Sequence, residues 1–208
     1  MLKKLYLYPL WIRVWHIINA LLFLALIFTG ISMQYAGTLS SLSMIKFEKA
    51  VQFHNIAAII LVLNYGFFVI GNAVSANRKF YQIKRTGLIK DLITQLKYYS
   101  FGMFRGEKHP FEINENNKFN PLQKVTYWGV IYILMPLLII SGLALLYPEI
   151  IIRQIFGMSG ILLTDLFHVF TGYLLSIFMI IHIYTCTLGP KPGTLFKSII
   201  NGYHEVHD

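Results

Sequence analysis

Four long apolar runs dominate the pattern along the chain. They cover roughly residues 10–33, 51–76, 125–147 and 161–188. Each is long enough to cross a bilayer, which takes about 20 mostly apolar residues in a helix. Because lipid offers the backbone no hydrogen-bond partners, each run is expected to be helical. The pattern predicts an all-α membrane protein, a four-transmembrane-helix bundle forming one domain over residues 1–208.

The connection between the second and third runs, residues 77–124, has a pattern of its own. In "TGLIKDLITQLKYYSFG" the apolar residues recur at helical spacing and the polar ones lie mostly elsewhere. The segment therefore predicts an amphipathic helix, either on the cytoplasmic membrane surface or packed beneath a partner subunit. The tail "TLFKSIINGYH" predicts a shorter element of the same kind.

Composition strengthens the membrane interpretation. Hydrophobic residues make up 56% of the chain and charged residues 13%, against about 25% charged in a typical soluble domain. The one cysteine, Cys186, excludes disulfide frameworks and cysteine-ligated iron–sulfur clusters within this chain. The motifs CxxCH, GxGxxG and HExxH and a P-loop are absent.

The distribution of positive charge predicts the orientation. Fifteen Lys and Arg residues lie in the N-terminal end, the 77–124 connection and the C-terminal tail, and three lie in the other two connections. Cytoplasmic loops carry such an excess, so both termini and the 77–124 connection are expected to be cytoplasmic. The net charge of +9 is thus explained by the cytoplasmic parts of a multi-pass membrane protein, and no nucleic-acid partner is expected.

Four of the seven histidines lie inside the predicted spans: His16, His54, His168 and His182. Ionisable residues are rare at that depth and indicate function by default. With the N-terminus inside, His54 and His168 share an outer level, and His16 and His182 share an inner one. The remaining three, which lie in loops or the tail and are expected to be solvated, are His109, His204 and His207.

The fourth span contributes a histidine to each level. His168 and His182 are fourteen residues apart, which separates them by roughly 21 Å along a helix and turns both toward nearly the same side. This arrangement predicts two haems, one per leaflet, each with two axial histidines on its iron. A zinc site is disfavoured, because zinc needs about four ligands and Asp165 is the only acidic residue close to either pair in the sequence.

Three further residues are candidates for haem contact. Gly30, fourteen residues after His16, and Gly172, one turn after His168, would let a flat ring approach the backbone, although glycine is common in membrane helices anyway. Arg13, one turn before His16, would pair with a haem propionate or extend to the membrane interface. Three other roles stay open: hydrogen-bonded bundle histidines, a proton or ion transporter, and a haem-free membrane anchor for a redox enzyme.

Five segments resemble the cytochrome b subunits of thiosulfate reductases and, more broadly, the gamma subunits of respiratory formate dehydrogenases and the b-type cytochromes of nickel–iron hydrogenases. They are "RVWHIINALLFLALIFTGISMQY", "FHNIAAIILVLNYGFFVIGN", "QLKYYSFGMFRGEKHPF", "KFNPLQKVTYWGVIYILMPLLIISGL" and "LFHVFTGYLLSIFMIIHIYTCTLG". The resemblance implies two b haems, an outer one on His54 and His168 and an inner one on His16 and His182. It also implies an electron-transfer subunit of an oxidoreductase complex in a bacterial or archaeal cytoplasmic (inner) membrane.

A quinone site beside the inner haem is a further implication of the resemblance, with menaquinone as the expected quinone. The matching residues are Asn120, Gln123 and Lys124, although Pro121 and Leu122 replace the Ala-Gly of the formate dehydrogenase relatives. From the residues alone, Asn120 and Pro121 also make a good helix start. The implied partner is a periplasmic molybdopterin or iron–sulfur subunit, or a multihaem cytochrome c, and the resemblance favours quinol oxidation with electrons leaving outward.

Overall fold

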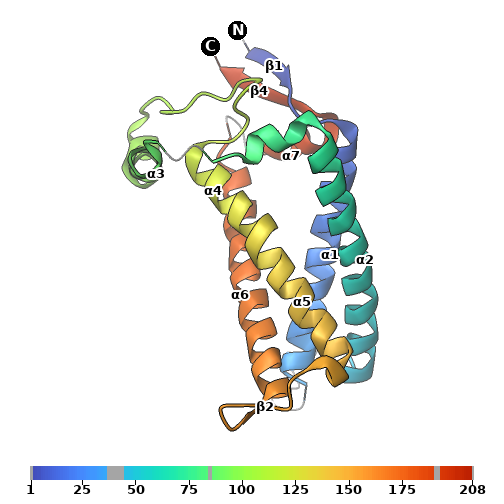
Figure 1. Cartoon of the computed structure of the whole chain (residues 1–208). Helices are drawn as coiled ribbons and strands as arrows, with labels where there is room; N and C mark the ends of the chain where they lie inside the picture. The colour runs from blue at the N-terminus through green and yellow to red at the C-terminus, as the bar shows by residue number, and fades with distance from the viewer. Residues whose placement is uncertain (1, 37–44, 84–85, 190–192, 208) are drawn as a thin grey trace.

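The computed structural model describes residues 2–36, 45–83, 86–189 and 193–207. Lys84, Arg85 and Lys191, three of the cations that predict the orientation, lie outside the described residues. Four helices long and apolar enough to cross a membrane stand side by side within the described part (Figure 1). The predicted all-α bundle is confirmed.

The spans follow the hydrophobic pattern closely. Helix α1 covers Leu10–Gln34, α2 Phe47–Val74 and α6 Gly160–Cys186. The third span runs from α4 (Pro121–Gly129) through the π-helical turn η4 (Val130–Leu134) into α5 (Met135–Leu146). Many large apolar side chains on these helices are exposed, as expected for surfaces that contact lipid.

The wide turn in the third span precedes a proline. Pro136 has no backbone N–H, so the carbonyl four residues earlier, on Tyr132, has no regular helical donor. The five-residue π turn ends directly before the helix that contains this proline, and such turns let a helix continue past a missing bond. The third span is therefore helical without interruption from Pro121 to Leu146.

One end of the bundle, which we call the terminal end, carries both chain termini (Figure 1). There β1 (Leu2–Tyr6) pairs antiparallel with β4 (Tyr203–His207). The amphipathic segments form α3 (Leu88–Lys97) and α7 (Thr194–Asn201), both as predicted. Short turns complete this end: η1 (Ala76–Tyr81), η2 (Tyr98–Gly102) and η3 (Met103–Arg105).

Two features of this end differ from the sequence predictions. The strand pair between the termini was not predicted. His204, expected to be solvated, is buried at 7% exposure on β4, because the strand pairing and α7 cover it, whereas His109 is exposed as expected.

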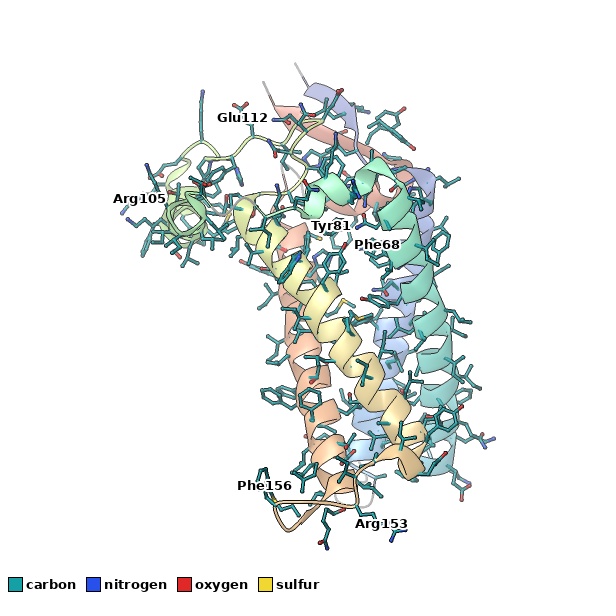
Figure 2. The ribbon with its side chains drawn as sticks, viewed as in Figure 1. Phe68, Tyr81, Arg105, Glu112, Arg153 and Phe156 are labelled. Carbon is teal, nitrogen blue, oxygen red and sulfur yellow. The ribbon has the colours of Figure 1, made fainter. Side chains whose placement is uncertain are left out.

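The opposite end, which we call the hairpin end, holds a small strand pair (Figure 1). After η5 (Pro148–Ile150), β2 (Gln154–Ile155) pairs with β3 (Met158–Ser159). The two residues between them, Phe156 and Gly157, both have positive φ, at 49° and 79°, the conformation that closes a two-residue hairpin. Figure 2 shows Phe156 and Arg153 at this end, far from the terminal end.

The buried core is arranged in two layers. One, at the terminal end, consists of Ile12, Trp15, Phe68, Tyr81 and Ile131. The second includes Phe23, Leu61 and Leu175, each seven residues after a span histidine. This second layer therefore lies midway between the two histidine levels and separates them with apolar side chains.

Candidate functional site

The structure brings the four span histidines together as two pairs. The ring centroids of His16 and His182 are 6.1 Å apart, and those of His54 and His168 are 6.4 Å apart. The first, the terminal-end pair, joins α1 to α6; the second, the hairpin-end pair, joins α2 to α6. All four side chains are half-buried.

Both separations fit one metal atom between two rings. Imidazoles bound to opposite sides of a metal, through nitrogen–metal bonds of about 2 Å, have centroids roughly 6.3 Å apart. Within the described part of the chain, His, Cys, Asp and Glu side chains do not form any group of three or more that could hold a metal ion, so a tetrahedral zinc site is disfavoured. Two nitrogens on opposite faces match the axial needs of haem iron.

The hairpin-end pair has hydroxyl partners that orient its rings. The Thr29 hydroxyl donates to the Ala25 carbonyl at 2.7 Å, so its oxygen accepts from Nδ1 of His54 at 2.9 Å. The Ser141 hydroxyl donates to Leu137 at 2.8 Å and accepts from Nδ1 of His168 at 2.9 Å. With each Nδ1 carrying the proton, each Nε2 keeps the lone pair that a metal requires.

The ring of His168 also lies against a glycine. A Cβ added at Gly142 would stand 3.0 Å from Cε1 of His168, closer than side chains normally approach. At Gly30 the corresponding distance to Cε1 of His54 is 3.8 Å. Gly30 thus faces the hairpin-end pair, the level the sequence predicts for it. Gly172 instead faces Leu138 of α5, whose Cδ1 would be 3.8 Å from an added Cβ.

The terminal-end pair has aromatic neighbours. The ring of Phe178 stacks on His182 at 5.6 Å, and the hydroxyl of Tyr127 lies 3.4 Å from Nδ1 of His182. Trp15 contacts the ring of His16 edge to face at 6.3 Å. The rings of Phe178 and Trp15 thus place apolar surface against the two histidines.

Arg13 points toward the C-terminal helix. One guanidinium nitrogen, Nη1, donates to the carbonyl of Ile200 in α7, and Nε is buried without a hydrogen-bond partner among the described residues. Its predicted pairing with a propionate stays a prediction. The structure adds a contact that ties α1 to the C-terminal helix.

The predicted quinone residues form the start of α4. The Asn120 side chain accepts from the backbone of Gln123 at 2.9 Å, and the Gln123 side chain accepts from the backbone of Asn120 at 3.2 Å. This capping box confirms the helix-start interpretation of Asn120. Asn120 also donates from Nδ2 to the Tyr99 hydroxyl at 2.9 Å, and the backbone of Lys124 donates to the Asn120 carbonyl at 2.9 Å. The Gln123 side chain contributes its oxygen to the cap, which leaves its amide nitrogen able to donate elsewhere.

The sequence reasoning missed Thr29, Ser141, Gly142 and Tyr127. A signal for the first three exists, because a hydroxyl residue directly precedes glycine at 29–30 and at 141–142. Both dipeptides lie at the predicted outer level, where a histidine needs a hydrogen-bond acceptor and room. Tyr127 has no comparable sequence signal, since tyrosine is common near span ends.

Ser141→Ala is expected to weaken haem binding at the hairpin-end pair. Loss of the oxygen that accepts from His168 Nδ1 frees the ring to rotate, and such partners are typically worth roughly 10–100-fold in affinity. Haem retention during detergent washes measures the effect. Ser176→Ala is the matched control, since its hydroxyl also bonds a backbone carbonyl in the helix, that of Gly172, at 2.8 Å; equal retention by both variants would contradict the role of Ser141.

Four membrane helices with two histidine pairs, one above the other along the bundle, define a b-type membrane cytochrome. A profile of the family described as prokaryotic cytochrome b561 matches residues 7–202, and the chain belongs to this family. It is 37% identical over 202 residues to the Escherichia coli (strain K12) protein named "Putative cytochrome YdhU", covering 97% of this chain and 75% of that one. A search of solved structures found no significant match.

Proposed function

We propose that the chain holds two b haems, one at each histidine pair, and carries electrons across the membrane as a subunit of an oxidoreductase complex. The observation that supports this best is the pair of ring separations, 6.1 and 6.4 Å. The shared helix α6 would set the two sites roughly 21 Å apart along its axis. One exchange site at each end of the bundle then suffices for transfer across the bilayer.

Bound haem would supply an iron couple that takes and gives one electron. The chain's own part is to fix the rings and exclude water. Thr29 and Ser141 hold Nδ1 of the hairpin-end histidines, and the apolar layer around Phe23, Leu61 and Leu175 keeps the two sites apart at a fixed spacing. Burial and hydrogen bonding of axial ligands are the means by which proteins tune such couples.

The proposed orientation has the terminal end in the cytoplasm. It rests on the excess of Lys and Arg there, against Lys46, Lys49 and Arg153 alone at the other side. The terminal-end haem would then exchange electrons with a quinone, menaquinone being expected. The hairpin-end haem would exchange them with a periplasmic molybdopterin or iron–sulfur subunit or a multihaem cytochrome c, with electrons leaving outward.

For the quinone we propose a position at the start of α4. Asn120, Gln123 and Lys124 lie at the head-group level, where amide and ammonium groups bind ring carbonyls. The residue best placed to separate the capping role from a ligand role is Gln123, because its oxygen serves the cap while its amide nitrogen remains able to donate.

Gln123→Glu is expected to raise the KM for a short-chain menaquinol roughly tenfold, as loss of one donor implies. Glutamate keeps the capping oxygen, so haem content and Tm should not change. Gln123→Leu loses both functions and should lower the Tm as well. The measurement is the rate of quinol-dependent haem reduction; an unchanged KM in Gln123→Glu would contradict the assignment.

A further inference from the structure

A pocket of about 620 Å³ opens on the side of the bundle, at the terminal end, where η1 meets the third span. Aromatic and polar side chains line it, and none of them belongs to the residues considered above for quinone. The lining includes Arg78, Tyr81, Gln82, Leu88, Trp128 and Tyr132.

A chain of buried hydrogen bonds ends at this pocket. Nζ of Lys118 donates to Oδ1 of Asn77 at 2.7 Å. Nδ2 of Asn77 donates to Oδ1 of Asn72 at 2.8 Å, and Nδ2 of Asn72 donates to the hydroxyl of Tyr132 at 2.6 Å. Lys118, Asn77 and Asn72 are all buried, at 2%, 6% and 3% exposure.

Lys118 fixes which group donates and which accepts in each of these hydrogen bonds. A lysine ammonium has donors only, so Asn77 must present its oxygen to it and its NH₂ group to Asn72. Asn72 must then present its NH₂ group to Tyr132. The Tyr132 oxygen is therefore an acceptor toward Asn72, and its own proton is left to donate to another group.

The Lys118 ammonium polarises this series of hydrogen bonds. It lies 4.4 Å from the ring centre of Phe80 and 5.4 Å from those of Tyr8 and Phe119. Within the described residues the ammonium donates to two neutral oxygens, those of Asn77 and Leu7. Burial, with repulsion from Lys79, lowers the pKa of Lys118 to about 8. A positive charge at one end strengthens each bond toward the other end, so the Tyr132 hydroxyl becomes a strong donor.

Ring contacts connect the pocket with the terminal-end pair. The centroid of Tyr132 is 6.1 Å from that of Tyr81, which is 5.8 Å from Phe68. Phe68 is 4.2 Å from Trp15, and Trp15 is 6.3 Å from His16. Figure 2 shows Phe68 and Tyr81 next to each other at this end of the bundle. The pocket is thus in continuous van der Waals contact with a proposed haem ligand.

We propose that this pocket binds a membrane-soluble ring compound carrying a carbonyl oxygen, with the Tyr132 hydroxyl donating to that oxygen and Trp128 packing on the ring. A quinone has this chemistry, and its choice as ligand rests on the proposed function. The position is a second one, separate from Asn120, Gln123 and Lys124. Lys118, Asn77 and Asn72 act as positioning residues that turn the Tyr132 proton toward the ligand.

The test uses the purified holoprotein in detergent and an azido-naphthoquinone as photolabel, with the labelled peptide located by mass spectrometry. Label is expected on the segment 128–132. The Kd of unlabelled short-chain naphthoquinone, from equilibrium dialysis, is expected to rise roughly tenfold in Tyr132→Phe and also to rise in Lys118→Met. Tyr65→Phe is the matched control, because its hydroxyl donates to the Ile131 carbonyl at 3.0 Å and does not line the pocket.

Label confined to the 120–124 peptide, or equal Kd values for Tyr132→Phe and Tyr65→Phe, would overturn the pocket assignment. So would label displaced by phosphatidylglycerol and not by unlabelled quinone, which would assign the pocket to a lipid head group through Arg78. If label maps to 128–132 while quinol fails to reduce bound haem, the pocket assignment stands and the proposed electron exchange fails. The two claims therefore fail separately.

Discussion

His168→Ala is expected to remove one haem per chain and to leave the other with its spectrum and redox potential unchanged. The ring of His168 faces that of His54 in the hairpin-end pair, at 6.4 Å, and a haem that loses one of its two histidine ligands in an apolar bundle would be held weakly. His54→Ala should give the same product. His16→Ala and His182→Ala should each remove the other haem instead. Haem content and potentiometric titration measure both outcomes.

His109→Ala is the control for this series, because His109 is exposed in the 77–124 connection and should leave both haems in place. Alanine at a span position also removes a polar group from the membrane, so the variants are expected to insert and fold. Loss of both haems in any single variant, or a different haem lost within one pair, would contradict the assignment of ligands. The pairing is what the four variants test.

Quinol-dependent haem reduction is expected to survive in His168→Ala and to fall to background in His182→Ala. The terminal-end pair contacts Tyr127 of α4, the helix at whose start the quinone is proposed, so the haem at this pair would be the first to receive electrons. The hairpin-end haem would receive them only through the first. Stopped-flow reduction by a short-chain menaquinol, followed in the haem absorption bands, separates the two variants.

The same variants give a second readout in vesicles. In proteoliposomes that hold menaquinol in the membrane and an impermeant oxidant outside, electron transfer to the oxidant should be lost in both variants, since each site is one half of the path. Dithionite reduction of the remaining haem is the control for haem function. Rapid reduction of the remaining haem by quinol in His182→Ala would instead place the quinone exchange at the hairpin end.

The spans and the histidine pairs could be predicted because lipid allows few alternatives. A membrane helix must be continuous and about 20 residues long, so depth along the chain follows from residue number. His16, His54, His168 and His182 could therefore be sorted into levels before any contact was known. The structure adds the distances of the rings within each pair.

The details missed by the sequence depend on contacts between distant residues. The strand pair joins Leu2 to His207 and Tyr6 to Tyr203, a pairing that no local pattern indicates. Ser141 reaches His168 across 27 residues. Such partners are set by how α5 and α6 pack, which the periodicity of either helix alone does not specify.

The burial of the Lys118 side chain is another detail that the sequence pattern does not predict. As one cation among the ten of the 77–124 connection, Lys118 helps to predict a solvated cytoplasmic loop, yet it is 2% exposed. Its burial depends on Asn77 of η1 and the carbonyl of Leu7, which lie 41 and 111 residues away in sequence. A count of charges predicts the side of the membrane and not the surroundings of one ammonium.

Each chain should hold two b haems, one between the two histidines of each pair. The most direct test is the haem-to-polypeptide ratio of the purified chain, from the pyridine haemochrome spectrum and amino-acid analysis, together with oxidised and dithionite-reduced spectra. Two histidine pairs predict b-type bands and about two haems per chain. A ratio of about one, or spectra without a b-type band, would contradict this prediction.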